Sequence, residues 1–165
     1  MALRRSVGGL LILALSAVAG SARAGLLDSP APTPQSGGSL RVVYRMGPVY
    51  YDPGWVDTIV MCTNLSAAPV ETVLEIFDEQ DAPVGGATRA VMPANGAVAF
   101  ATSTTAGADG AVIVSNLPAI THGKLRVSAT TSNITCNGHG RYRGDDGSVK
   151  ESPLSLVKKV AFGPP

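Results

Sequence analysis

The chain has 165 residues, which is the length of about one domain. Its 45 % of hydrophobic residues argues against a disordered chain, and its 15 % of charged residues argues against a coiled coil, which is rich in Glu and Lys. The formal net charge of +1 gives no field for holding DNA or RNA, so no nucleic acid is expected as a partner.

Residues 1–24 have the pattern of a secretory signal peptide. Arg4 and Arg5 form a positively charged start, an apolar run from Val7 to Gly20 follows, and Ala22-Arg23-Ala24 supplies the small residues that signal peptidase reads. The apolar run is shorter than the ~20 residues of a membrane span, and no longer run follows it. We therefore expect an exported protein, periplasmic or extracellular, with no membrane span after signal removal.

The rest of the chain divides into a short linker and one domain. Residues 25–39 are rich in Pro, Gly and Ser, which is typical of an extended tether, and residues 40–165 are enough to bury a core. Signal removal leaves 10 basic and 12 acidic residues. Most of the basic residues lie in residues 121–165, and we interpret them as a solvated face.

Strand-like segments recur along the domain with turn residues between them. The eight candidates are Leu40–Met46, Val56–Thr63, Val70–Phe77, Gly96–Thr102, Ala111–Ser115, Lys124–Thr130, Asn133–Asn137 and Leu154–Phe162. The composition of Asp78–Gly86 indicates a loop, and no amphipathic helix follows the signal. The pattern predicts an all-β fold, an antiparallel β-sandwich.

One candidate strand, Val56–Thr63, is apolar on both of its faces. Either it is central and covered on both sides, or it exposes a small apolar strip. Alternation alone does not decide between the two.

Two stretches of the chain resemble a known group of proteins. Met61-Cys62-Thr63-Asn64 and, later, Leu125-Arg126-Val127 with Ile134-Thr135-Cys136 are similar to small exported bacterial proteins of unassigned function. In that group a Cys-Thr-Asn opens one strand and a second Cys follows a late hairpin. The resemblance covers roughly residues 56–161 and implies an immunoglobulin-like β-sandwich of about seven to eight strands and an export route. It brings no catalytic residues.

Cys62 and Cys136 are the two cysteines of the chain. Because oxidising compartments preserve disulfides, the pair predicts a bond that closes a loop of about 75 residues. The alternative joins Cys136 to His139 as ligands of a cupredoxin-like metal site. Such a site needs two His, one Cys and usually a Met, but the last methionine is Met92 and His122 lies too near Cys136. We expect a disulfide, no metal and no cofactor.

No set of residues indicates catalysis. A G-x-S-x-G nucleophile motif is absent, and neither His has a nucleophile at a recognised spacing. Asp78, Glu79 and Asp81 could serve a paired-carboxylate hydrolase, but their run is interpreted first as a polar loop. We therefore expect a protein that is not an enzyme, with no catalytic residues.

Four aromatic residues lie close together in the sequence: Tyr44, Tyr50, Tyr51 and Trp55. They could form a binding surface on a loop, or they could plug the core beneath an edge loop. The sequence favours neither interpretation over the other.

A tripeptide known from integrin ligands, Arg143-Gly144-Asp145, precedes the strong turn signal Asp146-Gly147. Motifs of three residues often occur by chance, so we interpret the segment as a turn.

These observations predict an exported, non-enzymatic β-sandwich that acts in binding or as a structural component. Its partner would be another exported protein or a cell-surface component. Two alternatives stay open at this point: the metal protein built on Cys136 and His139, and a surface assembly or adhesion component that pairs strands at a sheet edge.

Overall fold

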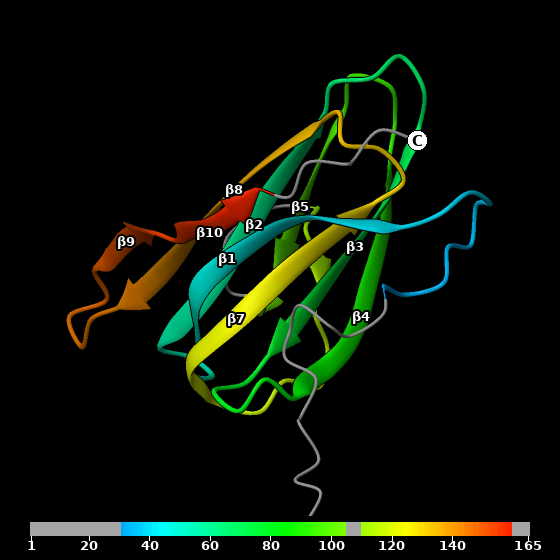
Figure 1. Cartoon of the computed structure of the whole chain (residues 1–165). Helices are drawn as coiled ribbons and strands as arrows, with labels where there is room; N and C mark the ends of the chain where they lie inside the picture. Colours follow the sequence, from blue (N-terminus) through cyan, green and yellow to red (C-terminus); the bar gives the residue numbers. More distant parts are fainter. Residues whose placement is uncertain (1–30, 105–109, 160–165) are drawn as a thin grey trace, which may run out of the picture.

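The computed structural model describes residues 31–104 and 110–159 (Figure 1). The predicted signal peptide, the first residues of the tether and residues 160–162 of the last predicted strand lie outside these ranges. None of the described segments is a helix with the length and hydropathy needed to cross a membrane.

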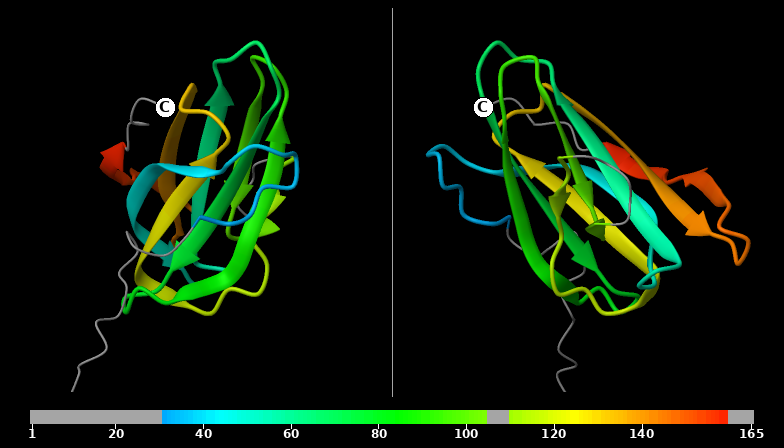
Figure 2. Two further views of the ribbon diagram at one scale, coloured as in Figure 1. Left: turned by 45° about the vertical axis from the view of Figure 1, so that its right-hand side comes forward. Right: turned by 180° about the vertical axis from the view of Figure 1, so that it is seen from behind.

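The described residues form two five-stranded sheets that pack face to face (Figures 1 and 2). Sheet A has the order β10 (Ser155–Lys159), β1 (Arg41–Tyr51), β7 (Ile120–Ala129), β3 (Val70–Phe77) and β4 (Pro83–Met92). Sheet B has the order β6 (Val112–Ile113), β5 (Ala97–Ala101), β2 (Val56–Asn64), β8 (Ile134–Arg143) and β9 (Val149–Pro153). All neighbours are antiparallel except β5 and β6. The predicted all-β sandwich is confirmed.

The main core lies between the sheets. Leu74 and Ile76 of β3 belong to the same buried cluster as Val60 of β2 and Phe100 of β5, and each is at most 2 % exposed. Because side chains alternate along a strand, Leu74 and Ile76 of β3 lie on its inner face, and Val73 and Phe77, on its other face, are buried as well. The bounds predicted for this strand, Val70–Phe77, are those observed.

The apolar strand β2 combines both of its predicted possibilities. It is central in sheet B, and its outer face carries Ile59 and Met61. Ile59 is 4 % exposed, because it packs with Ala101 in a second, small cluster, whereas Met61 is 49 % exposed. On the outer face of β2, Ile59 is therefore covered by the small cluster, whereas Met61, two residues further along, is exposed to solvent.

The loop predicted for Asp78–Gly86 is wrong in its second half, where β4 begins at Pro83. Gly85 and Gly86 have positive φ, and the pairing of β3 with β4 shifts register there. A Cβ on Gly85 would lie 2.5 Å from Leu117 Cδ2. The two glycines, which the sequence suggests are a turn, thus form an irregularity within strand β4, where the backbone passes close to Leu117.

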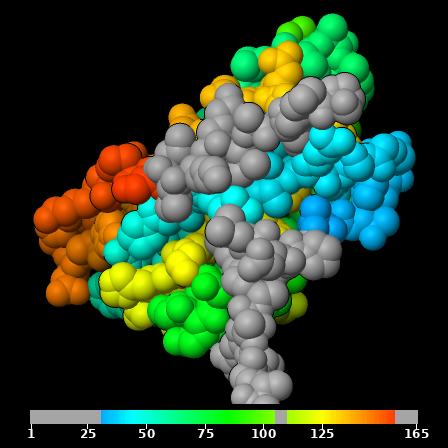
Figure 3. Space-filling view, viewed as in Figure 1, coloured from blue at the N-terminus to red at the C-terminus, as the bar shows by residue number. Residues whose placement is uncertain are grey.

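Strand β8 continues well beyond the predicted Asn133–Asn137, and β9 was not predicted. Gly138 looks like a breaker in the sequence, but a Cβ there would meet Leu154 Cδ1 at 2.7 Å, so the glycine allows close packing. The hairpin of β8 and β9 extends beyond the body of the sandwich (Figures 1 and 3).

Candidate functional site

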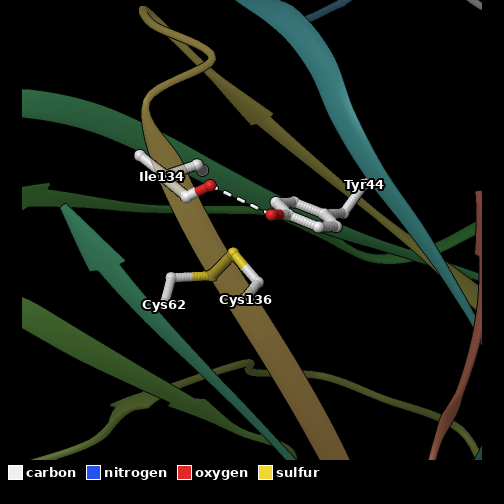
Figure 4. Close-up of a disulfide and its surroundings, with 4 residues drawn as sticks. All are labelled: Tyr44, Cys62, Ile134 and Cys136. Atoms are coloured by element: carbon white, nitrogen blue, oxygen red, sulfur yellow. Dashed lines mark hydrogen bonds between the residues drawn. A yellow bond between two sulfur atoms is a disulfide. The ribbon is translucent and has the colours of Figure 1, made fainter. Parts of the chain in front are cut away.

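The two cysteines form the predicted disulfide (Figure 4). Cys62 of β2 and Cys136 of β8 lie directly opposite each other on neighbouring strands, with Cα atoms 4.1 Å apart. The bond therefore lies within one sheet, whereas in antibody domains it joins the two sheets. It ties the strand that carries the projecting hairpin to the centre of sheet B.

The aromatic residues near this bond belong to the interior. Tyr44 is 3 % exposed, and its hydroxyl donates a hydrogen bond to the carbonyl oxygen of Ile134 at 3.0 Å (Figure 4). Tyr51 is half-buried and packs against the main core. Of the four aromatic candidates, these two help to hold the sheets together.

Tyr50 and Trp55 lie instead at the base of the projecting hairpin. The Tyr50 ring has its centroid 5.5 Å from that of His122 and 6.1 Å from that of Tyr142. Burial, and then the nearby Tyr50, raises the pKa of Tyr142. The carbonyl oxygen of Trp55 accepts a hydrogen bond from the N–H of Arg143 at 2.8 Å.

The outer face of sheet B presents two rows of side chains here. In the first row, Trp55 adjoins Arg143, which is paired with Val149. Trp55 is 50 % exposed and Val149 is 47 % exposed. These three residues, which we call the hairpin row, border a shallow hollow on the surface.

The second row is charged. Asp57, Arg141 and Glu151 are neighbours in register across β2, β8 and β9, and Arg141 Nε lies 3.4 Å from Glu151 Oε1. In this row the cation has an acidic neighbour. Arg143 in the hairpin row has no ion-pair partner among the described residues.

The tip of the hairpin contains the Arg-Gly-Asp tripeptide. The turn is closed by the N–H of Gly144, which donates to Ser148 O at 2.8 Å, and Gly147 has a positive φ of 79°. Hydrogen bonds from the Ser148 hydroxyl and N–H lower the pKa of Asp146. The predicted turn is thus present, and Asp145 is exposed on it.

The acidic loop considered for catalysis uses its carboxylates to organise the loop. Asp78 accepts hydrogen bonds from backbone N–H groups within the loop, and Asp81 forms an ion pair with Lys124 at 2.7 Å. The Thr121 hydroxyl, together with neighbouring backbone N–H groups, lowers the pKa of Glu79 to about 2. Each of the three carboxylates thus has local hydrogen-bond or ion-pair partners.

The alternative metal pair meets a chemical obstacle. A cysteine binds a metal ion as its thiolate, but the sulfur of Cys136 is bonded to Cys62. His139 Nε2 lies 3.9 Å from Glu151 Oε1. Among the described residues, no group of three or more His, Cys, Asp or Glu side chains is placed to hold a metal ion.

A second surface feature lies on sheet A, around Glu71. This carboxylate accepts hydrogen bonds from the N–H groups of Gln35 and Ser36 and from the Ser36 hydroxyl, and it forms an ion pair with Arg89 at 2.6 Å. Burial would raise the pKa of Glu71, but these bonds outweigh it and lower the pKa to about 2. Arg89 also donates to Thr33 O at 2.7 Å. Part of the predicted tether is thus bound to the sandwich.

Together these observations define an all-β sandwich with one disulfide within a sheet and an exposed aromatic and basic row on a projecting hairpin. Comparison with protein-family models, with curated proteins and with solved structures found no match for the chain.

Sequence reasoning missed Arg143, Val149 and His122 as neighbours of Trp55 and Tyr50. They lie 67 or more positions further along the chain, and only the register of β2 with β8 and of β8 with β9 brings the first two together. The Asp146-Gly147 turn signal is typical of a β-hairpin and could have predicted the two strands that flank it, β8 and β9.

Proposed function

We propose that the protein is an exported, non-enzymatic binding module that recognises another exported protein or a cell-surface component through the hairpin row. The predicted signal peptide supports export. A disulfide between Cys62 and Cys136 is typical of oxidising compartments and agrees with that route. We further propose an immunoglobulin-like relationship, on the sequence resemblance alone.

The observation that carries the proposal is the composition and exposure of the hairpin row. Trp, Tyr and Arg are the residues that most often dominate binding energy at protein interfaces. Here an exposed Trp55 and an exposed Val149 flank Arg143, and Tyr142 borders the same hollow. Strands β8 and β9 hold Tyr142, Arg143 and Val149, and hydrogen bonds of the Trp55 backbone to Asp52 and Arg143 fix the tight turn before β2, so a partner would bind without ordering a long loop.

Site-specific photo-cross-linking in cells that export the protein tests this proposal. A photoreactive residue replaces Trp55 in one variant and Leu65 in a control variant, since Leu65 is similarly exposed, at 53 %, but lies at the other end of β2. We expect a defined adduct from position 55 and none from position 65.

Three results would contradict the proposal. Equal adducts from both positions would mean non-specific contact, and no adduct from position 55 would remove the binding surface. Turnover by the pure protein in a broad hydrolase panel would count against its non-enzymatic nature.

A further inference from the structure

Strand β9 forms an edge of sheet B. It pairs with β8 on one side, and no described residue pairs with its other side. All five of its residues, Val149–Pro153, are exposed. An exposed edge of this kind offers backbone N–H and C=O groups to a further strand.

The direction of these backbone groups follows from the ends of the hairpin. Ser148 O accepts from Gly144 N, and Leu154 N donates to Gly138 O, both at 2.8 Å. In an antiparallel pair, alternate residues direct their N–H and C=O groups to the same neighbour. Val149 and Glu151 therefore direct theirs away from β8, toward the open side.

The side chains of β9 determine which partners can pair there. Val149 lies in the hairpin row, and Lys150, opposite Tyr142, points to the other face of the sheet. Lys150 has no ion-pair partner among the described residues, whereas Glu151 lies near Arg141. A strand with an acidic residue opposite Lys150 and an aliphatic residue opposite Val149 would complement both faces.

A second copy of this chain does not fit this edge. Two-fold antiparallel pairing of β9 with itself is centred on a single residue, and the two central choices, Lys150 and Glu151, each place that charged residue opposite its own copy. Like charges directly opposite each other destabilise a strand pair. Pro153 lacks an N–H and limits pairing to Val149–Ser152.

We propose that β9 accepts an extended acidic segment of an exported partner protein as an additional antiparallel strand of sheet B. The proposal rests on the binding function and specifies the chemistry of the partner. Lys150 favours a segment with an acidic residue opposite it, and it disfavours the addition of a basic segment. Trp55, the single tryptophan of the chain, lies in the hairpin row beside Arg143 of β8, so its fluorescence reports on binding at the neighbouring β9.

Two peptides of equal length test the proposal against the full exported protein. One is an eight-residue peptide of alternating Glu and Val with blocked ends, and the other alternates Lys and Val. We expect the acidic peptide to change Trp55 fluorescence in a saturable manner and the basic peptide to bind at least tenfold more weakly.

Variants of two residues in β9 sharpen the test. Lys150→Glu should reverse the preference between the peptides, while Lys124→Glu, a similar charge change on β7 of sheet A, should leave it unchanged. Glu151→Pro removes an outward N–H and should abolish binding, whereas Glu151→Ala keeps that N–H and should retain it.

The proposal is overturned if neither peptide binds, if both bind equally, or if Lys150→Glu leaves the preference unchanged. A dimer that Glu151→Pro abolishes would also overturn it, in favour of a second copy. If the peptides fail while the photo-cross-link from position 55 persists, strand addition is wrong and the binding function stands. If the cross-link is also absent, both proposals fail.

Discussion

Sheet A and the projecting end of sheet B use similar charged residues in different ways. On sheet A, Glu71 and Arg89 bond to each other and to the tether, and Glu75 and Arg126 form a second buried pair. On the hairpin, Arg143 and Lys150 have no acidic partner among the described residues. Charges that are paired within the fold contribute to its stability, whereas the unpaired charges on the hairpin are accessible from solvent, which is the basis of the proposed partner selection.

The largest effect is expected from the buried ion pair of sheet A. Arg126 Nε lies 2.6 Å from Glu75 Oε2, and the guanidinium lies 5.2 Å from the centre of the Phe77 ring. Breaking a buried pair by removing one partner costs about 3–5 kcal/mol, because a buried charge loses its counter-charge. Glu75→Ala should lower the free energy of unfolding in urea by that amount.

The matched control for this experiment is the more exposed pair formed by Lys124 of β7 and Asp81 in the loop between β3 and β4. Its atoms are 2.7 Å apart, but both side chains are partly solvated. Lys124→Ala should cost less than about 1 kcal/mol. If Glu75→Ala and Lys124→Ala lowered the free energy of unfolding equally, the contrast between the buried and the solvated ion pair would be wrong.

A smaller loss is expected from the disulfide. The bond spans 74 positions, and cross-links of this kind stabilise by about 2–4 kcal/mol through the unfolded chain. The double variant Cys62→Ala/Cys136→Ala should lower the melting temperature without changing the fold. Thiol titration of the exported wild type, unfolded without reductant, should find no reactive thiol; two per chain would refute the bond.

Glu71 gives a pH-dependent effect. Because its pKa is about 2 in the folded protein against 4.5 as its ordinary value, the carboxylate stabilises the fold above pH 4.5. That stability is lost as the pH falls from 4.5 toward 2. Glu71→Gln should cost about 1–3 kcal/mol at neutral pH. Its unfolding free energy should then fall less steeply than that of the wild type in acid; parallel curves would contradict the role of Glu71.

The smallest effect on stability is expected on the hairpin. Trp55→Ala removes an exposed side chain and should change the free energy of unfolding by less than about 0.5 kcal/mol. With a photoreactive residue at position 149, the same substitution should nevertheless weaken the partner adduct at least tenfold, as loss of a hot-spot residue does. Leu65→Ala is the control that should change neither quantity. If Trp55→Ala lowered the stability but left the adduct from position 149 unchanged, Trp55 would be a structural residue and not a binding residue.

The sequence predicted strands whose β-branched and apolar residues stand between clear turn residues. Val70–Phe77 was found with its observed bounds, because Val70, Thr72, Leu74 and Ile76 alternate with Glu71 and Glu75, although the structure buries both of its faces. Two of the four edge strands escaped the same reasoning: β4 contains two glycines, and β9 is exposed on both faces and shows no hydrophobic period.

The candidate site was only half predictable for a related reason. Tyr44 and Tyr50 are close in the sequence, yet one lies in the core and the other beside the hairpin. Composition finds aromatic residues but does not say which face of a strand they occupy once a strand shifts register, as β1 does against β7. The cysteine pair was predictable because no other thiol competes.

Amide hydrogen exchange resolved by residue tests the central claim, an open binding edge on the hairpin, most directly. In the free exported protein, the N–H groups of Val149 and Glu151 should exchange rapidly, while those of Lys150 and Ser152, directed toward β8, should be slower. Addition of the alternating Glu-Val peptide should slow Val149 and Glu151 and leave β3 unchanged. Slow exchange of Val149 and Glu151 in the free monomer would contradict the account, because the edge would then already be covered.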